Sequence, residues 1–286
     1  MGNERFSLMT MNLAKELIRG SMTVEDALRL VAEEGIPYVD VMRVSPKELG
    51  TYQKAITATG VKVCCYICYV SLFSGEKAIR SALEKDLCTA KSLGAQRVMI
   101  VPYYPVIDHR KAKKLGREQT LEALVRGFQI AVAMGREFGL DVCFETTPQE
   151  DIRLSGTDDC LYVLERVPGL SLVLDTANML PHGDEPLTAY EALKKYIVHV
   201  HLKDVTLHKA RPSPFPDERS ADGRRMQLVA IGEGVIPVRE IYHRMLADGY
   251  EGAFAIEYAR PRSGMCKKAE HRTQLEKHLA ALQIAH

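Results

Sequence analysis

The sequence predicts an α/β protein that folds as a single (β/α)8 barrel with one additional helix at the C-terminus. Eight short runs of strand-forming residues alternate with longer amphipathic segments, at a repeat of roughly 30 residues, which indicates a parallel sheet covered by helices. The count of eight favours a closed barrel over an open sheet. The first run is followed by Thr10-Met-Asn-Leu-Ala, which lacks the glycine-rich phosphate loop typical of open dinucleotide-binding sheets.

The expected strands are short and consist mostly of β-branched, aromatic and other apolar residues. In order along the chain they are residues 6–10, 38–42, 62–68, 97–102, 141–146, 170–175, 197–205 and 252–258. Such runs suit the strands of a TIM barrel, which are buried by the barrel interior on one side and by helices on the other.

The expected helices lie between these strands, and the last one follows the eighth strand. They are residues 23–34, 46–59, 75–93, 116–138, 157–166, 186–194, 238–248 and 265–284. Gly35, Gly60, Gly94, Gly139 and Gly249 directly follow five of them, at the position where glycine commonly ends a helix. No linker separates the elements, so we expect one domain over residues 1–286.

Two longer segments interrupt the regular alternation. Residues 103–116 follow the fourth strand, and residues 209–225, rich in proline and charge, lie between the seventh and eighth strands. Long loops in compact domains often carry function, and the loops that follow barrel strands emerge on the face that holds the active site. We therefore expect both segments on that face.

Composition indicates a cytoplasmic protein without a partner held by bulk charge. The formal net charge is +1, from 38 basic and 37 acidic residues, which gives no reason to expect a nucleic acid or an anionic membrane as partner. No apolar run approaches the ~20 residues that span a bilayer, and no signal-peptide pattern is seen. Three of the seven cysteines lie in the apolar run 61–70, which indicates reduced, buried thiols. Barrels of this type often pair, so a homo-oligomer is compatible with the sequence.

Four polar residues stand at or near the ends of the last four strands: Glu145, Asp175, His201 and Glu257. Successive strand residues point to opposite faces, and in each of these strands the large apolar side chains can all face the helices. The polar residue then points into the barrel near its C-terminal mouth. All four strands lead to the same placement.

Three carboxylates that converge in one barrel mouth repel one another, and a divalent cation would neutralise them. A set of three oxygen ligands and one nitrogen suits Mn²⁺, Mg²⁺ or Co²⁺, with Zn²⁺ as a further option, and we expect Mn²⁺. The alternative is four unrelated residues, each paired with a separate Lys or Arg. The common register of all four favours the metal.

The chain resembles the xylose-isomerase-like superfamily, which includes sugar phosphate isomerases and epimerases, tagatose and psicose 3-epimerases, hydroxypyruvate isomerase and inosose dehydratase. Four motifs carry the resemblance, which spans nearly the whole chain: Leu-Asp-Thr-Ala-Asn (174–178), His-Val-His-Leu-Lys-Asp (199–204), Gly-Glu-Gly-Val-Ile-Pro (232–237) and Ala-Ile-Glu (255–257). The resemblance implies that Glu145, Asp175, His201 and Glu257 bind the metal. It also implies that Glu145 and Glu257 form the acid/base pair.

Two positions differ from the pattern of many relatives. Thr147 and Asn178 stand where those relatives carry a histidine that could touch substrate or a second metal. In addition, Val-Thr-Leu (205–207) follows the seventh strand, where ketose 3-epimerases tend to place an arginine. These differences argue against a simple ketose 3-epimerase.

The expected function is that of a metal-dependent isomerase or epimerase, which moves a proton next to a metal-bound carbonyl of a sugar-like substrate. The first alternative is a dehydratase or lyase that acts on an inosose- or dehydroshikimate-like substrate. An endonuclease for abasic sites and a non-catalytic sugar-binding protein are further alternatives.

Loop and strand-end residues are the candidates for contact with substrate. The expected substrate-binding residues are Lys203, Asn178, His199, Tyr103 and His109. For His199, which lies one layer deeper in the barrel, orientation of His201 is the favoured role. The acid that a dehydratase needs could come from Tyr103, Tyr104, His109 or His208.

Overall fold

The computed structural model describes residues 3–103, 107–148, 154–209, 218–258 and 267–283 and contains a closed, eight-stranded parallel barrel. The strands follow one another around the barrel in the order β1-β10-β7-β6-β5-β4-β3-β2. They are β1 (Phe6–Met9), β2 (Tyr38–Met42), β3 (Lys62–Tyr69), β4 (Arg97–Val101), β5 (Asp141–Glu145), β6 (Leu170–Asp175), β7 (Ile197–Leu202) and β10 (Phe254–Ile256). The predicted fold class is confirmed.

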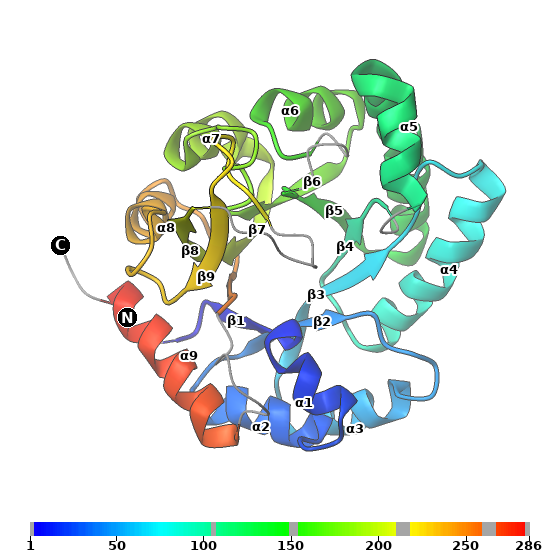
Figure 1. The fold of residues 1–286 in the computed structure, drawn as a ribbon. Coiled ribbons are helices and arrows are strands. Elements are labelled where there is room, and N and C mark those ends of the chain that lie inside the picture. The colour runs from blue at the N-terminus through cyan, green and yellow to red at the C-terminus, as the bar shows by residue number, and fades with distance from the viewer. Residues whose placement is uncertain (1–2, 104–106, 149–153, 210–217, 259–266, 284–286) are drawn as a thin grey trace.

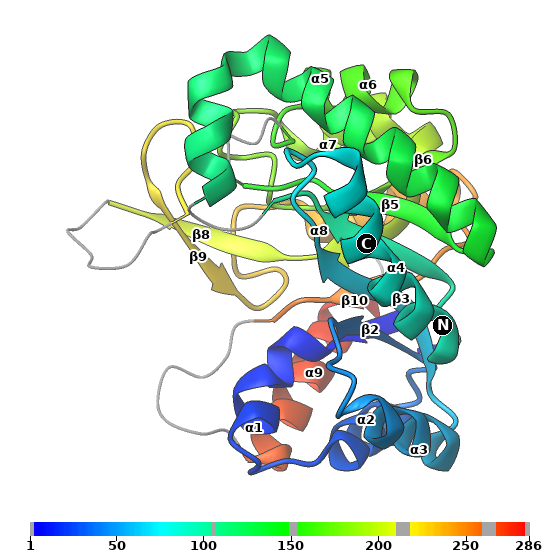
Figure 2. The same ribbon diagram turned by 90° about the vertical axis from the view of Figure 1, so that its right-hand side faces the viewer.

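Helices surround the barrel, as seen along its axis in Figure 1 and from the side in Figure 2. They are α1 (Ala14–Ile18), α2 (Val24–Glu33), α3 (Leu49–Thr59), α4 (Glu76–Ser92), α5 (Ile107–Phe138), α6 (Thr157–Arg166), α7 (Pro186–Leu193), α8 (Val238–Ala247) and α9 (Lys268–Gln283). In the described part of the chain, none of the helices has the length and apolar character needed to cross a membrane.

Helix α2 shows how the sequence sets a boundary. The hydroxyl of Thr23 accepts a hydrogen bond from the backbone N–H of Asp26, whose carboxylate accepts one from the N–H of Thr23 in return. This capping box satisfies two backbone donors that the first turn would otherwise leave unpaired. Behind it, Leu28 and Val31 pack into the layer between the barrel and the helices.

The barrel interior is filled by a small cluster that is separate from the main core. The cluster consists of Met9, Cys65, Ile67, Met99, Cys143, Val173 and Ala255. Strand alternation predicts that the last three share a face with Glu145, Asp175 and Glu257, respectively. The interior placement agrees with that alternation and puts the polar strand ends above an apolar plug.

A β-bulge alters the pairing of β2 with β3. Val39 pairs with Val63 and Asp40 pairs with Cys65, so Cys64 is an extra residue on β3. Bulges re-aim side chains next to functional sites. Here the bulge lies beside Asp40, a fully buried carboxylate in the middle of β2.

The predicted seventh strand, 197–205, is too long. β7 ends at Leu202, and residues Asp204–His208 form a separate strand, β8, which pairs antiparallel with β9 (Arg225–Val229). The segment expected as a long loop, 209–225, therefore joins the two strands of a hairpin, and residues 210–217 within it lie outside the described residues. The hairpin projects from the C-terminal face of the barrel in Figure 2.

The segment 103–116 also contains more regular structure than expected. Helix α5 begins at Ile107, and Gly116 interrupts it with φ 74° and ψ −177°. The predicted helix start at Gly116 is thus a kink that glycine tolerates without strain. Ahead of α1, a 3-10 turn at Thr10–Leu13 was also not predicted.

Candidate metal centre and pocket

Four strands bring the predicted ligands together at the C-terminal mouth of the barrel. Asp175 ends β6 and pairs in register with His201 of β7, which pairs in turn with Ala255 of β10. Glu257 directly follows β10, and Glu145 ends β5. One donor atom from each of Glu145, Asp175, His201 and Glu257 lies within 4.8 Å of the other three.

The geometry around His201 orients one ring nitrogen toward this cluster. Its Nδ1 contacts Oε1 of Glu145, and its Nε2 lies 3.1 Å from Oδ2 of Asp40. The ring is completely buried. Burial alone would lower the pKa of His201, but the carboxylates of Glu145 and Asp40 raise it well above its usual value.

Asp175 presents one oxygen to the backbone and the other to the cluster. Its Oδ1 accepts hydrogen bonds from the backbone N–H groups of Ala177 and Asn178, at 2.8 and 3.0 Å. Its Oδ2 is buried without a hydrogen bond from the described part of the chain, and lies 3.1 Å from Nζ of Lys203. A buried carboxylate oxygen held in this way is a suitable ligand for a cation.

Lys203 supplies a positive charge beside the acidic cluster. Its Nζ lies 3.1 Å from Oδ2 of Asp175 and 3.7 Å from Oε1 of Glu257. Burial would lower the pKa of Lys203, but Asp175 and Glu257 raise it well above its usual value. Burial raises the pKa of Asp175 to about 7 and also raises that of Glu257, although Lys203 opposes both shifts.

The donor set fits a divalent metal ion. One ammonium group faces three carboxylates, so the cluster carries an excess of negative charge that a divalent cation would remove. Three oxygen donors and one imidazole nitrogen suit Mn²⁺, Mg²⁺, Co²⁺ or Zn²⁺. Glu145, Asp175, His201 and Glu257 would hold the ion, and its charge would polarise a carbonyl or hydroxyl oxygen of a ligand in the pocket above.

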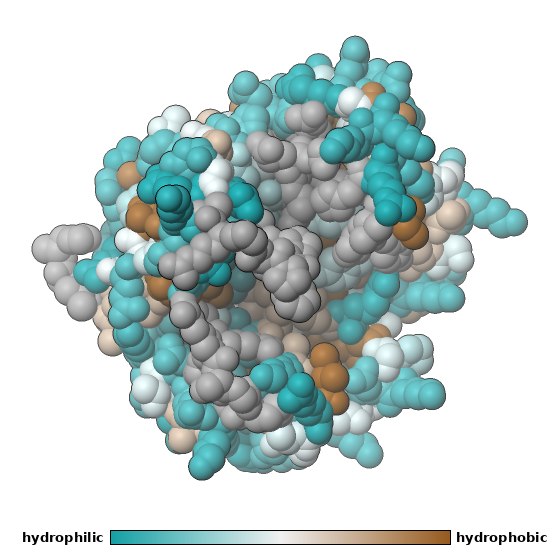
Figure 3. Space-filling model, in the orientation of Figure 1, coloured by the Kyte–Doolittle hydropathy of each residue, from teal (hydrophilic) through white to brown (hydrophobic). Residues whose placement is uncertain are grey.

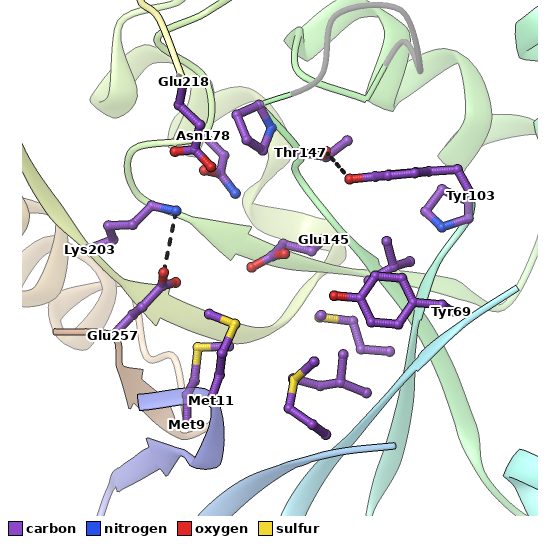
Figure 4. A pocket seen from close by; sticks show the side chains of 16 residues that line it. Met9, Met11, Tyr69, Tyr103, Glu145, Thr147, Asn178, Lys203, Glu218 and Glu257 are labelled. Atoms are coloured by element: carbon purple, nitrogen blue, oxygen red, sulfur yellow. Dashed lines mark hydrogen bonds and ion pairs between the residues drawn. The ribbon is translucent and has the colours of Figure 1, made fainter. Parts of the chain in front are cut away.

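A pocket opens directly above the cluster, and its two sides differ in character (Figure 4). Glu145, Lys203 and Glu257 form a charged side, together with Glu218 and Asn178. The opposite side and the floor are apolar or aromatic, and consist of Met9, Met11, Met42, Ile67, Tyr69, Met99, Val101, Pro102 and Tyr103. Figure 3 shows the same face, where hydrophilic side chains predominate among the described residues that lie farther from the centre.

The structure brings some of the predicted substrate-binding residues into the pocket and not others. Lys203, Asn178 and Tyr103 line it, and the hydroxyl of Tyr103 lies 3.4 Å from Oγ1 of Thr147. His199 is fully buried below the cluster, where it contacts Asp40, and does not line the pocket. The side chain of His109 lies outside the described residues.

Of the candidates for a general acid, the structure places one in the pocket. Tyr103 lines the pocket. The side chain of His208 is exposed on β8, lies 2.8 Å from Oγ1 of Thr206 and does not line the pocket. Tyr104 is outside the described residues.

Asn178 lines the pocket and carries an acceptor that no described residue uses. Its Nδ2 donates a hydrogen bond to the backbone oxygen of Thr146 at 2.8 Å, which fixes the orientation of the amide. Its Oδ1 is buried and receives no hydrogen bond from any described residue. Because buried polar atoms are nearly always paired, this oxygen is well suited to accept a hydrogen bond from a ligand hydroxyl.

Sequence reasoning missed several residues of the site. Tyr69 ends β3 and Glu218 precedes β9, and both line the pocket. Tyr69 could have been found as a polar strand end, whereas Glu218 comes from a hairpin that was not predicted. Asp40 could have been found because it is a charged residue inside an apolar strand, Tyr38–Met42. Burial alone would raise the pKa of Asp40, but His199 and His201 hold it well below its usual range.

The glycine motif 232–237 is a turn that a buried carboxylate holds in place. Asp204 accepts hydrogen bonds from the backbone N–H groups of Gly232, Gly234 and Ile236, at 2.8, 2.9 and 3.1 Å. These three donors are therefore used internally. The motif supports the hairpin beside the pocket and does not present these donors as a phosphate cradle.

Fold and site together define a class: a (β/α)8 barrel with three carboxylates and a histidine gathered beneath a pocket at its C-terminal mouth. The chain belongs to the family described as xylose isomerase-like TIM barrel, whose model matches residues 28–283. The predicted resemblance is thereby confirmed.

Two curated relatives are inosose dehydratases. The chain is 25% identical to that of Lacticaseibacillus casei over 138 residues, a match that covers 48% of this chain and 46% of that protein, about half of its length. It is 22% identical to that of Geobacillus thermodenitrificans over 251 residues, with 83% of each protein covered.

Two solved structures share the fold. A probable 3-DHS dehydratase, AsbF from Bacillus anthracis, matches with a TM-score of 0.71 and 18% identity, over 98% of this chain and 100% of that one. The IolI protein, solved with a zinc atom bound, matches with a TM-score of 0.69 and 16% identity, over 97% of each chain.

Proposed function

We propose that this chain is a divalent-metal-dependent enzyme that removes a proton next to the carbonyl of a small polyhydroxylated ketone and eliminates water from it. One observation carries the proposal: four donor atoms meet within 4.8 Å of one another beneath a pocket into which Glu145 and Glu257 both reach. From the sequence alone, isomerisation is the expected reaction. The names of the relatives, which are dehydratases, support elimination instead. Mn²⁺ is the proposed metal.

The two glutamates have the placement that proton transfer requires. Glu145 comes from β5 and Glu257 follows β10, with β6 and β7 between them, so they reach a bound substrate from different directions. One carboxylate takes the carbon-bound proton, and the electron pair of that bond forms a double bond beside the carbonyl. The hydroxyl on the next carbon leaves and takes a proton from the carboxyl group of the other glutamate, so that water is the second product.

Neighbouring residues would bind and orient the substrate. The ammonium of Lys203 can donate a hydrogen bond to a substrate oxygen, and Oδ1 of Asn178 can accept one from a hydroxyl. The apolar side, with Met9 and Tyr69, can pack against the C–H face of a ring and exclude water from it. A pocket with one charged side and one apolar side suits a compact polyol that places its carbonyl and hydroxyl groups against the charged side.

The test is an assay of the purified protein with Mn²⁺ and three classes of compound: inososes, dehydroshikimate and simple ketoses. We expect a metal-dependent rise in ultraviolet absorption from an unsaturated product, abolished by Glu145→Gln and by Glu257→Gln. Glu240→Gln, on the exposed surface of α8, is the matched control and should behave as wild type. Metal-independent product, or no turnover and no solvent deuterium uptake with any compound, would refute the proposal.

Isomerisation or epimerisation is the second candidate, and the same pair of glutamates favours it. A proton taken by one carboxylate can be returned by the other from a different direction, which inverts the carbon or moves the proton to its neighbour. A new epimer or isomer without any unsaturated product would establish this candidate over elimination.

A further inference from the structure

Asp40 lies beneath the metal centre and binds three side chains at once. Its Oδ2 lies 2.6 Å from Nε2 of His199 and 3.1 Å from Nε2 of His201. Its Oδ1 accepts a hydrogen bond from the hydroxyl of Ser7 at 2.6 Å. Asp40, Ser7 and both histidines are completely buried, so the arrangement is rigid and excludes water.

The partners of His199 set the direction of this network. Its Nδ1 lies 3.8 Å from Sγ of Cys64, the extra residue of the β2–β3 bulge, and that sulfur accepts a hydrogen bond from Arg97 at 3.0 Å. The thiol of Cys64 donates toward Oε1 of Gln96 at 3.6 Å, so the tautomer of His199 follows from Asp40, whose carboxylate oxygen accepts hydrogen bonds. Nε2 of His199 then carries the proton that it donates to Asp40.

His201 stands in the same relation to Asp40 but faces the pocket side with its other nitrogen. A carboxylate oxygen accepts hydrogen bonds, so Nε2 of His201 must carry a proton. Nδ1 lies against a second carboxylate, that of Glu145, and carries a proton there in the metal-free protein. A metal ion bound in the cluster would displace this proton, and the lone pair of the neutral ring would then be on Nδ1. Ring orientation and tautomer are therefore both determined from below.

We propose that Asp40 is a positioning residue, which fixes His201 as the Nε2–H tautomer and thereby directs the Nδ1 lone pair to the metal. Ser7 and His199 hold the carboxylate of Asp40 in place, and Cys64 with Arg97 holds His199. This inference rests on the proposed metal site. An alternative is that Asp40, His199 and His201 bind a second ion. One donor atom from each of these three residues lies within 4.8 Å of the other two.

The first experiment leaves Asp40 unchanged. The ¹⁵N-labelled protein is loaded with Zn²⁺, which is diamagnetic, and the imidazole nitrogens are observed by long-range proton–nitrogen correlation. We expect one histidine with a metal-bound Nδ1 and a protonated Nε2, assigned to His201 by its loss in His201→Gln. Coordination of His201 through Nε2, or an Nε2 without a proton, would overturn the inference.

The second experiment measures Zn²⁺ and Mn²⁺ affinity by titration calorimetry. We expect Asp40→Asn and Asp40→Ala to weaken binding by roughly 10- to 100-fold, as loss of a carboxylate behind a ligating histidine does. Asp86→Asn is the matched control, because Asp86 is also buried and ion-paired, to Arg43, but lies on α4 away from the cluster. Its affinity should equal that of wild type.

The outcomes separate this inference from the function that it extends. Wild-type protein that binds no metal would refute the proposed function itself. Wild-type binding of one ion, with unchanged affinity in both Asp40 variants, would refute only the role of Asp40, and so would the binding of two ions per chain. If the variants do not fold, the spectrum of the wild-type protein still decides the question.

Discussion

Replacement of Lys203 by methionine should make folding strongly dependent on the metal. Lys203→Met keeps the length and apolar stem of the side chain but removes the ammonium that lies 3.1 Å from Asp175 and 3.7 Å from Glu257. In the metal-free protein, the three carboxylates of the cluster would then lose their nearest ammonium. Bound metal would replace the lost charge.

The magnitude follows from burial. Removal of one partner from a buried ion pair costs about 3–5 kcal/mol. Asp175, whose pKa is already about 7, can take up a proton when the ammonium is lost, so we expect the lower end, about 3 kcal/mol at neutral pH. For a chain of 286 residues the unfolding entropy is about 0.6 kcal/mol/K, so the corresponding fall in Tm is about 5 °C.

The assay is thermal unfolding followed by circular dichroism, with chelator and with excess Mn²⁺. We expect the large fall in Tm in chelator and most of it restored by metal, because a ligand that binds only the folded state stabilises it. Lys194→Met is the matched control: Lys194 also contacts two carboxylates, at 2.9 and 3.0 Å, but is largely exposed, so its Tm should change little. A fall in Tm of Lys203→Met that metal does not relieve would refute this reasoning.

Three further predictions concern the pocket, the turn beside it and the metal itself. Asn178→Leu should raise KM about tenfold, because one uncharged hydrogen bond to substrate is lost, and should also lower Tm, because the buried backbone oxygen of Thr146 loses its donor; an unchanged KM would exclude the contact with substrate. Gly234→Ala should lower the free energy of unfolding by about 3 kcal/mol, measured by thermal unfolding, because the new Cβ would lie 2.0 Å from Oδ1 of Asp204. Gly50→Ala is the control and should not destabilise the protein, because the space around its Cβ is open. Affinity for Mn²⁺ in calorimetry should rise from about pH 6 to about pH 8, because the raised pKa of Asp175, about 7, means that a proton must leave before the metal binds; affinity independent of pH would contradict this.

The repeating pattern of the sequence was sufficient to predict the barrel. The alternation of short apolar runs with amphipathic segments located all eight barrel strands, and side-chain alternation placed Cys143, Val173 and Ala255 in the interior, where they lie. Periodicity works here because each strand is buried on both sides and each helix on one. The four predicted ligands meet for the same reason, since parallel strands end at one mouth.

Tertiary contacts set the features that the sequence did not predict. Nothing in residues 204–229 distinguishes a hairpin from the end of a strand and a loop, because the pairing of β8 with β9 connects positions about twenty residues apart in sequence. Glu218 reaches the pocket only through this hairpin. The bulge at Cys64, which brings that thiol to His199, depends on register between strands and has no local signal.

The role of His199 shows the limit of strand alternation. The pattern gave His199 and His201 the same face and placed His199 one layer deeper, but it does not identify the partner that His199 meets there. His199 lies one pair of residues below His201 and meets Asp40, a partner that is 159 positions away in sequence. The contact with Asp40, which links His199 to His201 through one carboxylate, required the structure.

The most direct test of the central claim is a titration of the metal-free protein with Mn²⁺, monitored by calorimetry or by the electron paramagnetic resonance of the free ion. If Glu145, Asp175, His201 and Glu257 form the centre, wild-type protein will bind one ion per chain. Asp175→Asn, with an unchanged circular dichroism spectrum, will bind it roughly 100-fold more weakly or not at all. A folded wild-type protein that takes up no divalent metal, or an Asp175→Asn variant that binds it as tightly as wild type, would contradict the account.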